Sequence, residues 1–374
     1  MQQLLHFAVS GQAAVIIVDI DLSYPRDPVK QKRAALSEAD LRLYHYLADY
    51  EAKYCKATCP HILLVRSFRQ PTTAVRPYPA QRPTFLDNIV AKSPHLHWAS
   101  VLFDREKDRI LRRWQLWETT CSAGQPEIVP SVSLLTLALL TDPKQGIHNI
   151  NKQLQQFRPA SCDQSTQKLP LELNRNDLLK ISDAVQLHPQ PSRLNRLIFY
   201  TIPWKLNPDE QRPNVPDGRF LLETLSAKNV LEHLDADSTA LLHNSITVIG
   251  GSYIESRDLY ATPLGWMPGA LILMNAVHTM LQHGELNAPP SWVLLAMVAV
   301  IIGLMSLLLI RFDSFWGMTF SGLVIIIIIL PISFWVLEYG VWLDFAIPLL
   351  IVQLRQMAAD YEEAIKKCTL VSQT

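Results

Sequence analysis

The chain lacks the features by which several large classes of protein are recognised. Its 34 lysines and arginines balance 34 aspartates and glutamates, so it has no net positive charge to hold a polyanion, and we expect no nucleic-acid partner. No G-x-x-x-x-G-K-[ST], G-x-G-x-x-G or G-x-S-x-G pattern occurs, and glycine is scarce, at 13 of 374 residues. We therefore expect neither an enzyme nor a cofactor.

Charged residues are also few, at 18% of the chain against a usual share of about a quarter, and the shortage is local. Residues 292–354 carry only four charges, at Arg311, Asp313, Glu338 and Asp344. About 20 apolar residues cross a hydrocarbon layer of roughly 30 Å as a helix. We predict a C-terminal bundle of two or three transmembrane helices, with spans at about residues 292–310, 318–337 and 341–357. An aspartate and a proline interrupt the third stretch, for which a re-entrant or interfacial helix is the alternative.

The basic residues near these stretches predict the orientation. With three spans, the loop after the first span and the C-terminal tail share one side and hold Arg311, Arg355, Lys366 and Lys367. Basic loops tend to stay in the cytoplasm. We therefore predict an extracytoplasmic body at residues 1–290, a transmembrane region at 291–357 and a short cytoplasmic tail at 358–374. The lipid bilayer, the inner membrane if the cell is Gram-negative, is then a partner. The first 21 residues nevertheless show no export signal with a basic start and a cleavage site.

The body has the pattern of an α/β fold. Residues 13–20 and 61–68 are short apolar runs typical of buried strands, and residues 37–54 between them have helical spacing. Such a strand–helix–strand unit predicts a mixed, mainly parallel sheet with flanking helices. The remaining expected elements are an antiparallel pair at 97–104 and 110–117, a helix at 132–140, a flexible loop or insertion at 141–190, strands at 197–202 and 246–251, and a helix at 267–281.

One segment carries the most specific pattern. Residues 246–275 read ITVIGGSYIESRDLYATPLGWMPGALILMN: a strand ends in two glycines, an aspartate precedes T-P-L-G, and M-P-G opens a helix. This order resembles the CHASE-two domain, the second type of sensory extracellular domain associated with cyclases and histidine kinases. In that family two or three transmembrane helices follow the domain. Members normally also have an N-terminal span and a C-terminal effector domain; neither is visible here, and we expect a truncated start.

The resemblance implies a membrane-anchored sensor module. It would bind an unidentified stimulus outside the cytoplasm and pass a conformational change through its transmembrane helices to a partner in trans. That partner would be a kinase, a cyclase or another membrane protein, and a homodimer is possible. The alternative function is a structural or assembly subunit of a membrane complex.

Polar and glycine residues at the predicted strand ends are the candidates for ligand binding. Asp19 and Asp21 end a buried strand, at the edge where open α/β sheets bind ligands, and alternation places them on one face. Capping or pairing with an arginine is the alternative for both aspartates, and a tight exit from the strand is the alternative for the glycines. The full candidate set is Asp19, Asp21, Arg66, Gly250, Gly251, Asp258 and Thr262.

The histidines and cysteines do not predict a particular site. His95 and His97 flank a strand start, but no ligand at metal-binding spacing accompanies them, and we expect no metal site. Of the five cysteines, the four in the body allow three fully paired connectivities, and a bond between Cys55 and Cys59 is permitted but not required.

Overall fold

The structure is a computed structural model. The chain divides into two compact units, one of Met1–Gln190 with Arg196–Gln282 and one of Pro191–Asn195 with His283–Thr374, and the second lies almost wholly outside the described residues. The structure describes residues 1–24, 35–55, 59–69, 78–105, 108–162, 178–182, 185–187, 196–204, 221–232, 239–251 and 258–284, together with Trp292, Ala296, Gly303 and Ile327.

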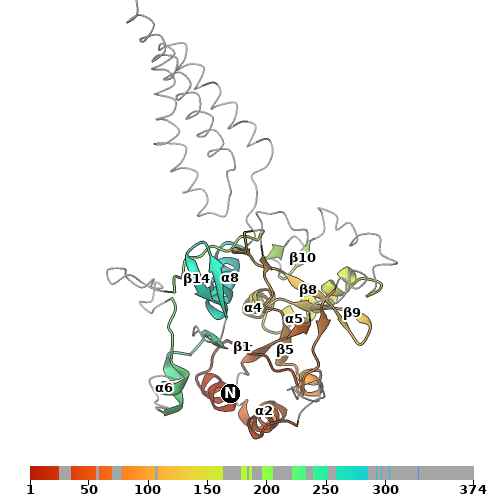
Figure 1. Cartoon of the computed structure of the whole chain (residues 1–374), viewed down its shortest axis with the longest axis vertical. Coiled ribbons are helices and arrows are strands. Elements are labelled where there is room, and N and C mark those ends of the chain that lie inside the picture. Colours follow the sequence, from red (N-terminus) through yellow and green to blue (C-terminus); the bar gives the residue numbers. More distant parts are fainter. Residues whose placement is uncertain are drawn as a thin grey trace, which may run out of the picture. The chain divides into compact units, whose positions relative to one another are not determined.

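A four-stranded sheet forms the centre of the first unit (Figure 1). Its order is β12-β1-β2-β5, made by Ile246–Gly250, Val15–Asp19, His61–Val65 and Leu96–Ala99. All three pairings are parallel. The short apolar runs form strands as predicted, because side chains on both of their faces are covered by helices. The mixed, mainly parallel α/β class is confirmed.

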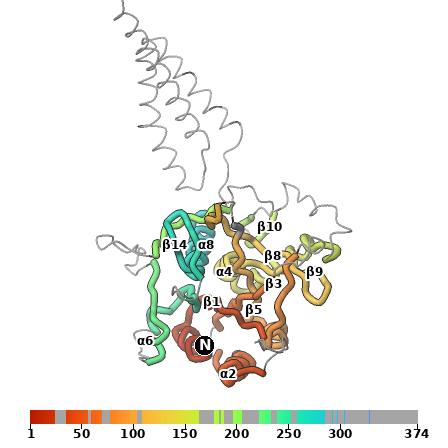
Figure 2. Tube along the Cα trace, viewed as in Figure 1, coloured from red at the N-terminus to blue at the C-terminus, as the bar shows by residue number. Residues whose placement is uncertain are grey.

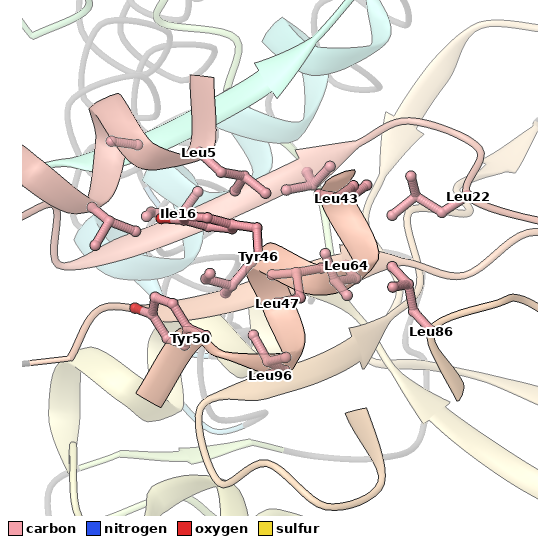
Figure 3. Close-up of a cluster of buried hydrophobic side chains, with 14 of the residues drawn as sticks. Leu5, Ile16, Leu22, Leu43, Tyr46, Leu47, Tyr50, Leu64, Leu86 and Leu96 are labelled. Carbon is pink, nitrogen blue, oxygen red and sulfur yellow. The ribbon is translucent and has the colours of Figure 1, made fainter. Parts of the chain in front are cut away.

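Three N-terminal helices cover one face of this sheet. They are α1 (Gln2–Ser10), α2 (Glu38–Ala48) and α3 (Asp87–Val90). Figure 3 shows Leu43, Tyr46 and Leu47 of α2 among the buried side chains of the sheet. Helix α2 begins at a capping box, in which the Asp40 N–H donates to Ser37 Oγ at 3.2 Å and the Ser37 N–H donates to Asp40 Oδ2 at 3.0 Å. It continues into the π-helical turn η1 (Tyr50–Tyr54).

Two later helices cover the opposite face. Val15, Ile17 and Leu63 point to this side and pack with residues of α4 (Val132–Thr141) and α8 (Gly269–His283). Helix α4 is buried almost all round, which explains its continuous apolar sequence. Helix α8 begins two residues later than predicted, because Met267 and Pro268 belong to a strand.

A second layer of short elements surrounds the fully buried Trp114. Its main sheet has the order β3-β4-β8-β9, and the T-P-L-G segment forms the turn of the β13–β14 hairpin. The short elements of this layer are β3 (Phe68–Arg69), β4 (Ala80–Gln81), β6 (Asp104–Arg105), β7 (Leu111–Arg113), β8 (Trp117–Ser122), β9 (Gln125–Pro130), α5 (Gly146–Leu154), η2 (Gln155–Phe157), β10 (Leu179–Lys180), β11 (Gln186–Leu187), β13 (Leu259–Thr262) and β14 (Gly265–Pro268). Helix α6 (Ala227–Glu232) packs instead against α1, and its Val230 belongs to the core of the first face.

Three sequence-based predictions of secondary structure were wrong. Residues 97–104 and 110–117 do not pair throughout: β5 joins the parallel sheet, and only the short β6 pairs with β7. The stretch 141–190 contains α5, which buries Ile150 and Leu154 against α4. Residues 197–202 make a single bridge, between Arg113 and Leu197, and no strand. Apolar runs alone do not distinguish a strand from an extended segment that another element covers.

Two disulfides join the four cysteines of the body. Cys55 bonds to Cys59 across a Cα–Cα distance of 5.1 Å, and Cys121 bonds to Cys162 across 6.1 Å. Both distances are ordinary for disulfides. This is one of the three connectivities that the sequence allowed.

The predicted spans at 292–310, 318–337 and 341–357 lie outside the described residues apart from single positions. Within the described part of the chain, no helix combines the length and the apolar character needed to cross a bilayer.

Candidate functional site

The switch in sheet topology lies between β1 and β12. The chain leaves β1 for α2 on one face of the sheet and leaves β12 for α8 on the other. In open α/β sheets, ligands bind in the crevice that this divergence leaves at the carboxyl ends of the strands. The last residues of the two strands, Asp19 and Gly250, are register partners at this edge.

A second carboxylate, that of Asp258, lies at the same edge, beside the start of α8. The backbone N–H of Gly269 donates to the Asp258 carbonyl at 3.0 Å. A methyl group at Gly269 would lie 2.6 Å from Asp258 Oδ2, and one at Gly250 would lie 3.3 Å from Cβ of Asp19 and 3.2 Å from Cβ of Ala270. Gly269 therefore allows a close approach that a side chain would prevent, and a side chain at Gly250 would require its neighbours to shift by a few tenths of an ångström. Asp19, Asp258 and the first turn of α8 meet here.

The charge of one of these two carboxyl groups acts on the other, because Asp258 raises the pKa of Asp19. Burial, and next the charge of Asp258, raise the pKa of Asp19 to about 6. Burial also raises the pKa of Asp258, although hydrogen bonds from the Tyr260 side chain and the Gly269 backbone oppose the rise. Two neighbouring carboxylates that are partly shielded from water favour a proton or another positive charge between them.

Asp21 lies beyond the end of β1 and has its own partners. Ser67 Oγ donates to its carboxylate at 2.6 Å, the Ser23 N–H at 2.9 Å and Arg82 Nη1 at 3.0 Å. Burial raises the pKa of Asp21, but the hydrogen bonds from Ser23 and Ser67 and the charge of Arg82 outweigh burial and lower it. These contacts match the alternative expected for Asp21, which was capping and pairing with an arginine.

Arg66 is buried at the end of β2 and is also engaged. Its Nε donates to Gln81 Oε1 at 3.0 Å, its Nη1 pairs with Asp87, and its guanidinium lies 4.6 Å from the ring centroid of Trp98. Asp87 in turn accepts from the Thr84 N–H at 2.9 Å. These contacts fix the chain between β2 and α3.

The remaining candidates, Thr262 and Gly251, lie in the turn of the β13–β14 hairpin and just after β12. Thr262 Oγ1 donates to the Gly265 carbonyl at 2.7 Å and so closes the β13–β14 turn, whereas Asp258 precedes the base of the hairpin. Gly251 follows β12 directly, and residues 252–257 lie outside the described part. The structure therefore brings together Asp19, Gly250 and Asp258 of the candidate set. Gly269 of the M-P-G helix start, which sequence reasoning expected only to allow a close approach of the backbone, lies beside Asp258 and was not in the candidate set.

Sequence reasoning also missed a histidine cluster at the opposite edge of the sheet. His61 Nδ1 lies 3.1 Å from His97 Nε2, and the His95 ring lies 5.0 Å from that of His61. Glu51 lies 3.2 Å from His95 Nδ1. Burial, and next the neighbouring histidines, lower the pKa of His61 and of His97 to about 4. No group of three or more suitable side chains within the described ranges is arranged to hold a metal ion.

The architecture defines the class first: an open, mainly parallel α/β domain with two carboxyl groups at its switch point. The chain belongs to the CHASE2 domain family, whose model matches residues 1–310. CHASE2 is a sensory extracellular domain, so the resemblance read from residues 246–275 is confirmed. No curated protein and no solved structure matched the chain in parallel searches.

Proposed function

We propose that this chain is a membrane-anchored sensor whose body lies outside the cytoplasm and binds its stimulus in the crevice between β1 and β12. The observation that carries the proposal is the meeting of Asp19, Gly250 and Asp258 at the topological switch point of a CHASE2 domain. Family membership supports a sensory role. The uncharged stretches after residue 291 support anchoring in the cell membrane.

The stimulus suited to this crevice carries a positive charge. Burial and the charge of Asp258 disfavour the ionised form of Asp19, and a cation beside the two carboxyl groups offsets that cost. The nearby arginines Arg66 and Arg82 form ion pairs with Asp87 and Asp21. A small metabolite with an amine or guanidine group fits this arrangement.

Helix α8 is the element suited to carry the response. It starts beside the crevice at Gly269 and ends at His283, and the uncharged stretch that begins at Trp292 follows it. A ligand shifts a domain between two states only as far as it binds them differently, so contact with the first turn of α8 would bias the position of that helix. The output passes to a kinase, a cyclase or another membrane partner in trans, or to a second copy of the chain.

The test uses the full chain in detergent and its thermal unfolding midpoint. The probes are spermidine and arginine, each titrated against the wild type, Asp19→Asn and Asp21→Asn. A probe that occupies the crevice raises the midpoint of the wild type and of Asp21→Asn but not that of Asp19→Asn, because a ligand stabilises only a state that binds it. Equal shifts in all three proteins, or a shift in none, would contradict this crevice as the site. A kinase or cyclase recovered by pull-down from solubilised membranes would identify the output.

A further inference from the structure

The tip of the β13–β14 hairpin exposes the two most accessible large apolar side chains described in the first unit. Trp266 is 68% exposed and Leu264 is 54% exposed. Their neighbours on the other side of the hairpin are buried, Met267 at 1% and Thr262 at 5%. The hairpin is therefore packed on the body through one face and presents a tryptophan and a leucine on the other.

The hairpin runs alongside α8 rather than away from it. Asn275 Nδ2, in the second turn of α8, lies 3.7 Å from the sulfur of Met267, only two residues before the helix begins. Met267 also shares a buried cluster with Ile272, Ala276 and Met280 of α8. Figures 1 and 2 show the hairpin beside the helix.

This packing places the hairpin tip near the level of the C-terminal end of α8. A strand advances about 3.3 Å per residue and a helix about 1.5 Å, so Gly265 and Leu264 lie about 13 to 16 Å along a helix that is about 21 Å long. The tip and the end of α8 thus point the same way. From Gly284, eight residue steps at most about 28 Å long lead to Trp292, where the first uncharged stretch begins.

The composition of this region suits an interface with lipid. Residues 259–284 contain no aspartate, glutamate, lysine or arginine. Insertion of the tip would therefore desolvate no formal charge. Tryptophan is the side chain most enriched at the boundary between headgroups and hydrocarbon, because its ring is apolar and its N–H can still bond to water or headgroups.

We infer that Leu264 and Trp266 form a membrane-contacting tip that enters the headgroup region of the outer leaflet. This inference rests on the proposed anchoring of the chain. The tip gives the body a second point of attachment besides the chain connection through residues 285–291. Movement of α8 on ligand binding then takes place against a hairpin held at the bilayer surface.

The experiment uses the full chain reconstituted in vesicles. On a Cys368→Ser background, Leu264→Cys is labelled with the environment-sensitive fluorophore NBD. The control is Leu231→Cys in α6, which has a similar exposed fraction, 42%, and which Figure 1 shows well apart from β14. Vesicles contain either ordinary lipid or lipid with a nitroxide near the headgroup. The label at position 264 should emit at shorter wavelength and be quenched several-fold by the nitroxide lipid, whereas the label at 231 should be unaffected.

Each other outcome overturns the inference in a recognisable way. A label at 264 that remains in water at both lipid compositions shows that the tip does not touch the membrane. Emission at shorter wavelength without quenching shows that protein covers the tip, and dependence on the number of chains per vesicle identifies a second copy. Release of the chain from vesicles at alkaline pH refutes the anchored sensor itself, whereas retention with an unquenched label refutes the tip alone.

Discussion

Three partly buried titratable side chains make the stability of the body depend on pH in opposing directions. His61 and His97 have pKa values lowered to about 4 from an ordinary 6.5, whereas Asp19 has a pKa raised to about 6 from 3.8. The histidines contribute stability above about pH 6.5, which is lost as pH falls towards 4, because the unfolded chain then binds more protons. Asp19 has the opposite effect, since its folded form binds a proton more readily between pH 6 and 3.8.

We therefore predict that two variants change the pH dependence of stability in opposite ways. From pH 7 to pH 5, the free energy of unfolding of the wild type should fall. The fall should be smaller in His61→Gln/His97→Gln and larger in Asp19→Asn, which removes the opposing group. Urea unfolding of the full chain in detergent, followed by tryptophan fluorescence at a series of pH values, measures each slope. Identical slopes in the three proteins would show that these groups do not titrate as their burial requires.

At the scale of elements, α8 holds an extended segment through side chains. Asn275 is fully buried; its amide donates to the Ile202 carbonyl at 3.0 Å, and its Oδ1 accepts from the Ile202 N–H at 3.0 Å. One turn later, Thr279 Oγ1 accepts from the Phe199 N–H at 2.9 Å, and its single proton lies between the Asn275 carbonyl at 2.8 Å and the Phe199 carbonyl at 3.2 Å. Residues 199–202 thus bond to a helix in the way that a strand bonds to its neighbour.

Replacing Asn275 by leucine should cost about 2–4 kcal/mol of unfolding free energy, because it leaves two buried backbone groups of Ile202 without their partners. Gln153 provides a matched control. It bonds the N–H and carbonyl of Lys180 at 2.8 and 2.6 Å in the same way, but at an exposed position where water can replace it. Gln153→Leu should therefore cost about 1 kcal/mol or less. Urea unfolding of both variants measures the difference, and equal losses would contradict the role given to Asn275.

At the scale of the whole body, the two disulfides close loops of very different size. Cys121 and Cys162 are 41 residues apart and join β8 to the chain after η2, whereas Cys55 and Cys59 are only 4 apart. By the chain-entropy argument, a crosslink stabilises by limiting the unfolded chain, and the larger loop gains more. Such bonds form in oxidising compartments, which agrees with a body outside the cytoplasm.

Removing the larger loop should therefore destabilise the body more. We expect Cys121→Ser/Cys162→Ser to lose up to about 4 kcal/mol of unfolding free energy and Cys55→Ser/Cys59→Ser about 2 kcal/mol. Urea unfolding of the oxidised full chain provides the comparison. If the small loop proved the more costly to open, local packing around η1 rather than loop closure would be responsible.

Periodicity and composition predicted the local parts of this protein. The runs that became β1, β2 and β12 and the helices α2 and α4 follow from neighbouring residues alone, because a buried strand or an amphipathic helix leaves its period in the sequence. The family also followed from one continuous segment. The same reasoning failed at residues 197–202, whose apolar pattern fits a strand but whose partner is a pair of side chains on α8.

The amino-acid sequence by itself determined the buried strands β1, β2 and β12, the helices α2 and α4, and where apolar surface must be buried. Tertiary structure alone decided that β12 lies beside β1, that Asp258 therefore comes close enough to Asp19 to change its pKa, and that His61 meets His97. The physical reason is that propensity and periodicity act between near neighbours, whereas strand order and the meeting of distant charges depend on how the whole body packs.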